Sequence, residues 1–429
     1  MNGWLLFYNT LIVPALYGGF HLLSLVHRKI RHGIRGRKGL FERLRQQAEQ
    51  MGTGPRLWIH VSSLGEYEQA KPIASFAKER WPELKVVVSF FSPSGYEHAN
   101  TTGVDAITYL PFDSPPNARR YVELLRPSVA LVVRHDIWPN HVRALRQENI
   151  PVLLVDASLP PRRGLAGTLA RGLYRRLFSL FSAICAISRE EAEAISRLVP
   201  GTRVEACGDT RYDQVVRRAR ELAPIRDLVD HPSFKNIDLI VLGSTWPSDE
   251  DVLFPALVPC LKRPHTRAIV CPHEPSEDRV LDIVEYFRQA GFRPVTLSTW
   301  RQRPTDDWDV IVVDSVGLLA NLYALGQVAY VGGSFGPGVH SVLEPAAHGR
   351  AIVVGPRYHN SPDARLLVEK GTARVVENVE DARRTFEELL DDPSSREKMA
   401  VEALELVRSH TGAAENILDL IAEYVKELQ

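Results

Sequence analysis

The sequence predicts an α/β protein with two doubly wound parallel-sheet domains behind an apolar N-terminal segment. Short, continuously apolar runs alternate with helical stretches along most of the chain. This alternation stops between residues 214 and 236, in a charged and proline-punctuated stretch, and then starts again. The chain has 429 residues, which is long enough for two full domains.

The apolar N-terminal segment is followed directly by a basic one. Residues 4–26 contain no Lys, Arg, Asp or Glu, and residues 27–39 contain six Lys or Arg and no acid. We expect residues 1–30 to anchor the protein in a membrane, with the basic side kept cytoplasmic. Whether the segment spans the bilayer or lies on it stays open, and a helix packed on the protein itself is the alternative.

The strands of the two predicted domains are nearly continuous apolar runs, as a sheet covered on both faces requires. In the first domain they are residues 56–63, 85–91, 106–112, 129–136, 151–158 and 183–188. In the second they are residues 239–245, 267–273, 310–315, 328–334 and 351–356. Beyond the anchor we expect an N-terminal domain over 31–215, a linker over 216–236, a C-terminal domain over 237–405, and a helix over 406–429 that packs back on the N-terminal domain.

Overall composition excludes several classes of protein. Hydrophobic residues make up 45% of the chain and charged residues 24%, which is ordinary for a globular protein. The formal net charge is zero, so nothing in the overall charge points to a nucleic-acid partner. The four cysteines are widely separated, without a CxxC pair, which favours buried thiols over a metal site or disulfides.

Polar residues follow the first and fourth predicted strands, at the edge where doubly wound sheets bind ligands. The stretch "VSSLGE" brings Ser63, Gly65 and Glu66 to a helix start, where backbone amides attract an anion and where an ordinary capping glutamate is equally expected. The stretch "RHDIWPN" brings a charged cluster around Asp136. Burying such a cluster is costly, which favours a functional role.

The second domain carries a glycine loop beside one carboxylate. "VAYVGGS" is a predicted strand, "FGPG" a loop that lets backbone approach a ligand closely, and residues 339–349 a short helix. Two explanations of Glu344 stay open. Ser341 and Glu344 have the spacing of a capping box, and a carboxylate beside such a loop could instead accept hydrogen bonds from a ribose diol.

The whole chain resembles a known family of transferases. The motifs that carry the resemblance are, in order, "GLFERL", "WIHVSSLGE", "SFFSPSG", "YLPFD", "DIWPN", "GDTRYD", "GSTWPSDE", "VGGSFGPGVHSVLEPAAHG" and "VVGPRYHNS". Together with the N-terminal segment they look like a divergent branch of the 3-deoxy-D-manno-octulosonic acid (Kdo) transferases. The resemblance implies a GT-B fold, in which two Rossmann-like domains face a cleft.

The same resemblance implies an activity and its partners. It implies transfer of Kdo from a CMP-Kdo donor to a lipid A precursor, in lipopolysaccharide inner-core biosynthesis, at the cytoplasmic face of the inner membrane. It implies inversion at the anomeric carbon and neither a metal nor another cofactor. Inner-membrane lipids would be further partners.

By this resemblance Glu42 in "GLFERL" matches the general base, which would take the proton of the attacking sugar hydroxyl. Asp136 matches a position that is usually glutamate and supports the transition state. Arg211 in "GDTRYD" matches a position that is usually lysine, where a cation would neutralise the departing CMP phosphate.

The positions that match the nucleotide site lie in the second domain, and several depart from the family pattern. They are Pro272, His273, Val316, Gly317, Leu318, Ser341, Val342, Leu343 and Glu344. His273 stands where the family has arginine, Leu318 where it has glutamate, and Ser341 where it has asparagine. Backbone contacts to the donor survive such changes and side-chain contacts do not, so Glu42 and Glu344 carry the hypothesis best.

Acceptor binding is expected in the first domain, at Ser63, Gly65 and Glu66 and in the basic segment at Arg35, Arg37 and Lys38. Arginines beside the proposed base could hold the phosphates of a lipid acceptor. A topology signal explains the same cations without any substrate contact. Two alternative functions stay open: another membrane-anchored GT-B enzyme that uses a UDP-sugar, and a catalytically silent sugar-nucleotide-binding protein.

Overall fold

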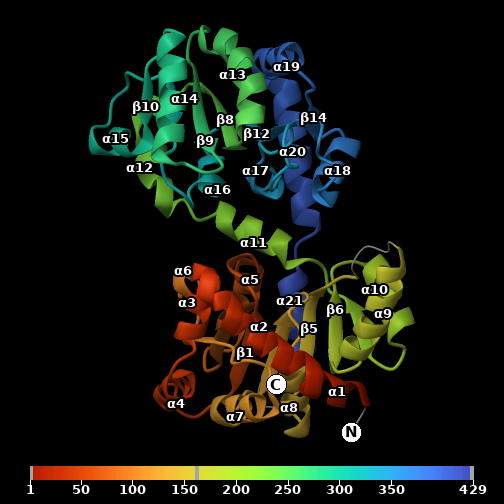
Figure 1. Cartoon of the computed structure of the whole chain (residues 1–429). Coiled ribbons are helices and arrows are strands. Elements are labelled where there is room, and N and C mark those ends of the chain that lie inside the picture. The colour runs from red at the N-terminus through yellow and green to blue at the C-terminus, as the bar shows by residue number, and fades with distance from the viewer. Residues whose placement is uncertain (1–2, 160–163, 426–429) are drawn as a thin grey trace. The chain divides into compact units, whose positions relative to one another are not determined.

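The computed structural model describes residues 3–159 and 164–425, and for residues 164–170 it describes the backbone alone. The chain divides into two compact units, shown in Figure 1. Unit 1 comprises Met1–Gln214 and Thr411–Gln429, and unit 2 comprises Val215–His410. Residues 1–2 and 426–429, which belong to the predicted anchor and C-terminal helix, lie outside the described residues.

Unit 1 is built on a parallel seven-stranded sheet with the order β3-β2-β1-β4-β5-β6-β7. Its strands are β1 (Arg56–Val61), β2 (Lys85–Phe90), β3 (Ala106–Tyr109), β4 (Val129–Val133), β5 (Val152–Ala157), β6 (Ala183–Ala186) and β7 (Arg203–Ala206). The chain moves outward from β1 to β3 and then returns to the other side of β1 with β4. The carboxyl ends of β1 and β4 are therefore the switch point at which such sheets bind ligands.

Both faces of this sheet are covered, which explains the continuously apolar strands. Leu57 and Ile59 pack into one buried cluster, whereas Trp58, which points to the opposite face, packs into another. The helices of unit 1 that follow the N-terminal segment are α4 (Leu40–Gln50), α5 (Leu64–Arg80), α6 (Pro93–His98), α7 (Pro115–Leu125), α8 (Pro139–Gln147), α9 (Gly164–Phe178) and α10 (Arg189–Leu198). Helix α11 (Thr210–Ala219) begins in unit 1 and continues into unit 2.

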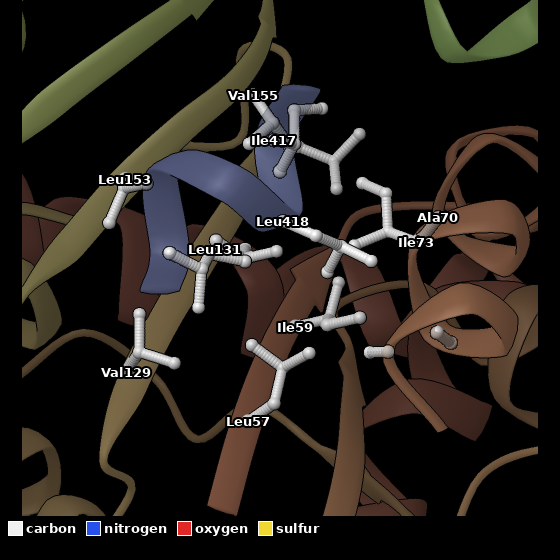
Figure 2. Packing of buried hydrophobic residues seen from close by; sticks show 14 of the residues in the cluster. Leu57, Ile59, Ala70, Ile73, Val129, Leu131, Leu153, Val155, Ile417 and Leu418 are labelled. Carbon is white, nitrogen blue, oxygen red and sulfur yellow. The ribbon is translucent and has the colours of Figure 1, made fainter. Parts of the chain in front are cut away.

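The C-terminal helix α21 (Ala413–Tyr424) is part of the unit 1 core. Figure 2 shows Ile417 and Leu418 beside Leu131 and Ile59 of the sheet and Ile73 of α5. Asp213 of α11 fixes the start of α21, because its carboxylate accepts hydrogen bonds from the backbone amides of Gly412 and Ala414.

Unit 2 repeats the architecture, with a parallel sheet of order β10-β11-β9-β8-β12-β13-β14. Its strands are β8 (Asp238–Thr245), β9 (Thr266–Pro272), β10 (Pro294–Thr296), β11 (Val310–Val312), β12 (Val328–Val331), β13 (Ala351–Val354) and β14 (Ala373–Val375). Its helices are η2 (Ala223–Ile225), α12 (Arg226–Asp230), η3 (Pro232–Phe234), α13 (Pro247–Leu261), α14 (Glu277–Gln289), α15 (Leu297–Gln302), α16 (Leu319–Leu322), α17 (Leu343–Ala347), α18 (Pro362–Glu369), α19 (Val379–Asp391) and α20 (Pro393–Ser409). Its switch point lies between β8 and β12.

The N-terminal segment is helical along its whole described length. It runs through α1 (Gly3–Phe7), the π-helical turn η1 (Tyr8–Ile12) and α2 (Val13–Val26). The backbone bends at His27, and the basic helix α3 (Arg28–Gly36) packs against α2. The Arg31 side chain donates hydrogen bonds to the carbonyls of Ser24 and Leu25, which have no partners within α2.

Candidate active site

The carboxyl ends of β1 and β4 bring a buried histidine against Asp136. His60 is the fifth residue of β1, and its Nε2 lies 2.9 Å from Oδ2 of Asp136, just after β4. The other ring nitrogen of His60 lies 2.9 Å from Oγ of Ser89, which also accepts a hydrogen bond from the Trp58 indole. This chain of contacts fixes the carboxylate of Asp136 at the ligand-binding edge of unit 1.

Asp136 remains acidic although it is largely buried. Burial is the largest single influence and would raise its pKa, but the hydrogen bond and charge of His60, with smaller contributions from Trp138 and Ser62, together lower the pKa. The side chain keeps 18% of its surface exposed. Asp136 is therefore an ionised carboxylate that is still partly accessible.

Glu66 is occupied by the start of helix α5. Its Oε2 accepts hydrogen bonds from the backbone amides of Ser62 and Ser63, and Ser63 and Glu66 together form a capping box. Burial raises the pKa of Glu66. Ser63 and Glu66, which were expected at the acceptor, are thus paired in this capping box. Gly65, the third of these residues, lies between them.

Glu42 lies in the first turn of α4 and is exposed to solvent over 56% of its side chain. Its carboxylate accepts a hydrogen bond of 2.8 Å from Arg45 and another of 3.2 Å from Gln46. The hydrogen bond and the charge of Arg45 lower the pKa of Glu42. Glu42 is therefore ionised at neutral pH and open to a ligand.

Two contacts place helix α4 beside the edge strand β3. Later in α4, Gln47 donates to the carbonyl of Ile107, near the start of β3. Just before α4, Gly36 is packed so tightly against the ring of Tyr109, at the end of β3, that an added Cβ would lie 2.5 Å from it. The first turn of α4 is thus toward the carboxyl ends of the strands.

An apolar cavity of about 210 Å³ lies between the N-terminal helices and the sheet of unit 1. It is lined by Phe20, Lys29, Ile30, Gly33, Ile34, Arg37, Phe91, Ser92, Pro93 and Phe112. Nearly all of the exposed lining is carbon. Of the two charged side chains in this wall, Lys29 is largely exposed to solvent and Arg37 is largely buried.

The three cations predicted to hold acceptor phosphates have different surroundings. Arg35 and Lys38 are exposed. Arg37 is largely buried, and its guanidinium donates to the carbonyls of Gly33, Phe91 and Leu110. Burial lowers the pKa of Arg37 to about 10. Arg37 therefore joins the N-terminal helices to the sheet, and Arg35 and Lys38 are the cations left facing solvent.

A second acidic cluster lies at the carboxyl ends of β5 and β7. Arg211 donates to both carboxylate oxygens of Asp209, at distances from 2.7 to 3.1 Å. Buried Asp156 accepts hydrogen bonds from the backbone amide and hydroxyl of Thr210. β7 is three strands from β4, so Arg211 and Asp136 are separated across the sheet by roughly 14 Å.

Three aromatic rings meet at the switch point of unit 2. His273 stacks on Trp246 with ring centroids 4.7 Å apart, and on His340 at 4.5 Å. The Trp246 indole donates to Nε2 of His340, and Oγ of Ser244 lies 2.9 Å from Nδ1 of His273. Burial, with a further contribution from His273, lowers the pKa of His340. A neutral His340 ring can accept the hydrogen bond from the Trp246 indole.

The glycine loop after β12 is held by a buried carboxylate. Asp249 of α13 is fully buried and accepts hydrogen bonds from the backbone amides of Gly333 and Phe335 and from the hydroxyl of Tyr330. At Gly332 an added Cβ would lie 2.2 Å from the carbonyl oxygen of Ser244. The loop is therefore held in one conformation against the end of β8.

Glu344 is not part of a capping box, contrary to one of the two predicted explanations. Helix α17 begins at Leu343, four residues later than expected, and its N-cap residue Val342 makes no side-chain cap. Glu344 instead lies 3.8 Å from Arg218, which also donates to the carbonyl of Gly317. A long-range ion pair thus replaces the local cap.

The other positions predicted to bind nucleotide differ in what they can offer. Val342, Leu343 and Pro272 are buried, so they can contact a ligand through backbone atoms alone. Ser341 and Val316 are exposed, and Leu318 is partly buried. Gly317 has φ +90°, a conformation that strains any side chain, which accounts for a glycine there.

Several residues of these clusters were not predicted from the sequence, namely His60, Trp246, Asp249 and His340. Each contacts a residue that lies far away along the chain, so no local pattern marks it. Among the residues that the structure describes, no group of three or more His, Cys, Asp or Glu side chains is placed to hold a metal ion.

Comparisons with known proteins agree with this arrangement. Residues 33–214 match the family model described as 3-deoxy-D-manno-octulosonic-acid transferase (kdotransferase). The Kdo transferase of Haemophilus influenzae is 26% identical over 99% of both chains. That of Aquifex aeolicus is 26% identical over 78% of this chain and 86% of its own. The structure of the UDP-GlcNAc 2-epimerase from Neisseria meningitidis has a TM-score of 0.61 at 15% identity, over 87% of this chain and all of its own.

Two Rossmann-like units with parallel sheets and switch-point ligand edges define a protein of the GT-B structural class. The epimerase, at its low identity, supports this fold alone. Within the class, the chain is similar to the Kdo transferases, through the family model over residues 33–214 and through relatives at 26% identity.

Proposed function

We propose that the protein transfers Kdo from CMP-Kdo to a lipid A precursor, in lipopolysaccharide inner-core biosynthesis, at the cytoplasmic face of the inner membrane. The observation that carries the proposal is the match to a curated Kdo transferase over 99% of both chains. The two chains therefore correspond over nearly their whole length. The exposed and ionised carboxylate of Glu42 supports the proposed chemistry.

The proposed reaction is a single displacement with inversion. The acceptor hydroxyl loses its proton to Glu42 as its oxygen forms a bond to the anomeric carbon of Kdo. The bond from that carbon to the phosphate oxygen breaks at the same time, and CMP leaves with both electrons. Glu42 then passes its proton to water. No covalent intermediate on the protein is required.

Asp136 and Arg211 have supporting roles in this proposal. An anionic Asp136, held by His60, would stabilise positive charge that develops on the sugar in the transition state. Arg211 would neutralise the departing phosphate. Since Arg211 already pairs with Asp209, it would have to share its guanidinium between that carboxylate and the phosphate.

The apolar cavity beside the N-terminal helices supports a lipid acceptor. An apolar cavity of about 150 Å³ is enough to bind benzene, and this one, at about 210 Å³, has room for part of an alkyl chain. Exposed Arg35 and Lys38 follow in the same segment and would hold the acceptor phosphates. An apolar cavity beside cations is complementary to a phosphorylated glycolipid, which carries alkyl chains and phosphates.

The donor is proposed to bind unit 2. Glu344 would accept hydrogen bonds from the ribose diol of CMP, and Gly317 would offer backbone contacts to the base. His273, whose ring stacks on both Trp246 and His340, would replace the arginine of the family pattern as a phosphate contact. Further contacts to the donor, through backbone atoms and the shape of the site, would come from Pro272, Val316, Leu318 and Ser341–Leu343.

A transfer assay tests the proposal. The full-length protein in detergent is given CMP-Kdo and a tetraacylated lipid A precursor, and the products are weighed by mass spectrometry. We expect a mass gain of one or more Kdo units. If no Kdo is added, but UDP-sugars supplied in place of CMP-Kdo are consumed, the chain uses another donor. If nucleotide protects the protein against thermal unfolding but nothing is transferred, the protein is a silent binder.

A further inference from the structure

The N-terminal apolar segment is long enough to cross a membrane yet is attached to unit 1 along its side. Gly3–Val26 is a helix of 24 residues with a mean hydropathy of 1.4 over its most apolar window. By length and composition alone it qualifies as a transmembrane span. The contacts it makes with unit 1 distinguish between a span and an in-plane helix.

The first attachment is a buried polar network at the π-helical turn. The hydroxyl of Tyr8 donates to Asp113, at 2.8 Å, and the carboxylate of Asp113 also accepts from the backbone amides of Asn140 and His141. The Asn140 side chain donates to Asn9 at 2.7 Å. Tyr8, Asp113, Asn140 and His141 are each less than 9% exposed.

The second attachment lies further along the segment. The ring of Tyr17 meets Phe112 edge-on at 5.4 Å, and the ring of Phe20 contacts both Phe91 and Phe112 at 5.6 Å. Twelve residues separate Tyr8 from Phe20, which corresponds to roughly 18 Å of helix axis. Unit 1 therefore contacts the segment over a length that exceeds half the thickness of a bilayer core, which is about 30 Å.

The face turned away from unit 1 is apolar and exposed. It carries Leu6, Phe7, Leu11, Ile12, Leu16, Leu22, Leu23, Leu25 and Val26. Exposed cations follow at once, at Arg28, Lys29 and Arg35. An apolar stripe followed by cations is complementary to a bilayer surface with anionic headgroups.

We propose that this helix lies in the plane of the membrane surface and does not cross the bilayer. Crossing would require one of two changes. Either the segment leaves unit 1, and the buried Asp113 loses its Tyr8 partner, or unit 1 enters the hydrocarbon together with the helix. The first leaves buried polar groups unpaired, and the second places charged surface in lipid. Lying in the plane requires neither change.

Depth measurements on the full-length protein test this orientation. Single cysteines at Leu6, Leu16 and Leu25 carry a fluorophore, and brominated lipids in phosphatidylcholine–phosphatidylglycerol vesicles quench it. The four native cysteines are buried and stay unlabelled. We expect one shallow depth for all three labels, about 5–10 Å below the surface. A label at Leu16 near the bilayer centre, with Leu6 and Leu25 near opposite surfaces, would overturn the proposal.

A crosslink asks whether the helix stays docked when lipid is present. The double variant Asn9→Cys/Asn140→Cys joins two side chains that touch, whereas Thr10→Cys/Asn140→Cys places the first cysteine on the exposed side of the helix. On oxidation in vesicles we expect a disulfide in the first variant and none in the second. A disulfide that forms in detergent but is lost in vesicles would mean that the helix leaves unit 1 to span the membrane.

Discussion

The carboxylate of Glu42 is exposed to solvent and is hydrogen-bonded to Arg45. These two properties have opposite effects on its use as a base. Exposure lets an acceptor hydroxyl reach the carboxylate, whereas Arg45 lowers the pKa of Glu42 and so weakens it as a base. Because the pair is exposed, its contribution to stability is small. The influence of Arg45 is therefore expected in the pH dependence of the reaction.

Replacing Arg45 with Ala should move the acidic limb of the pH–rate profile to higher pH. The substitution removes the hydrogen bond and charge that hold the pKa of Glu42 down, so the carboxylate becomes protonated at a higher pH than in the wild type. kcat/KM measured from pH 3 to 8 shows the shift. Arg45→Lys, which keeps the cation, should shift the limb less. A limb that stays in place in Arg45→Ala would separate Glu42 from the proton transfer.

Asp156 should make the stability of unit 1 decrease as pH rises. Burial, and then the charge of Asp209, raise the pKa of Asp156 from 3.8 to about 7. Between these values the folded state holds a proton that the unfolded chain releases, so the free energy of unfolding falls with rising pH and levels off above pH 7. Asp156→Asn, whose amide oxygen can still accept from Thr210, should remove this dependence.

Thermal unfolding of Asp156→Asn and of the wild type between pH 4 and pH 8 checks the prediction. The variant should gain stability relative to the wild type as pH rises. If the stability of the variant and of the wild type changed in parallel with pH, the prediction would be contradicted.

Sequence reasoning at the residue scale singled out Glu42, Asp136 and Glu344 because each lies in a motif. It missed His60 and Asp249, since their partners Asp136 and Gly333 are 76 and 84 residues away along the chain. It also proposed a local cap for Glu344, whereas the structure gives this residue a long-range ion pair with Arg218. Local spacing identifies chemistry, but it does not identify a distant partner.

At the scale of elements, the central strands and the edge strand β3 were predicted, whereas the edge strands β7, β10 and β14 were not. The predicted strands are continuous apolar runs because both faces of each sheet are covered. β7, β10 and β14 have three or four residues and lie at sheet edges, and their side chains are mostly exposed or half-buried. Without a buried face they carry no apolar run to detect.

The glycine loop after β12 should depend on Asp249. Asp249→Ala leaves the buried amide of Gly333 and the buried hydroxyl of Tyr330 without their acceptor, so the free energy of unfolding of unit 2 should fall by about 3 kcal/mol or more. Urea unfolding measures this loss. Asp251→Ala, in the same helix but exposed, is the matched control and should change little. An equal effect of the two substitutions would contradict the role given to Asp249.

Helix α21 should behave as part of unit 1 although it follows unit 2 in the chain. Ile417 is fully buried against the unit 1 sheet, so Ile417→Ala should destabilise that unit by about 2–5 kcal/mol. Hydrogen exchange should rise in β1 and β4 and stay unchanged in unit 2. Glu415→Ala, on the exposed side of α21, serves as control. Faster exchange confined to unit 2 would refute this assignment.

The whole chain was predicted as two doubly wound domains, and the structure has two parallel seven-stranded sheets. The rhythm of strands and helices was enough for this prediction because each unit is a complete βαβ succession. The sequence could not decide whether the N-terminal segment spans a membrane, lies on it or packs on the protein itself. That question depends on contacts such as Tyr8 with Asp113, which lie 105 residues apart.

The measurement that tests the central claim most directly is the rate of Kdo transfer in Glu42→Gln beside Glu49→Gln. Both glutamates are exposed on α4 and both pair with Arg45, so the two substitutions differ in position alone. We predict that Glu42→Gln lowers kcat by about 10²–10⁴-fold with CMP-Kdo binding unchanged, and that Glu49→Gln stays near the wild type. Glu42→Gln as active as the wild type would contradict the account.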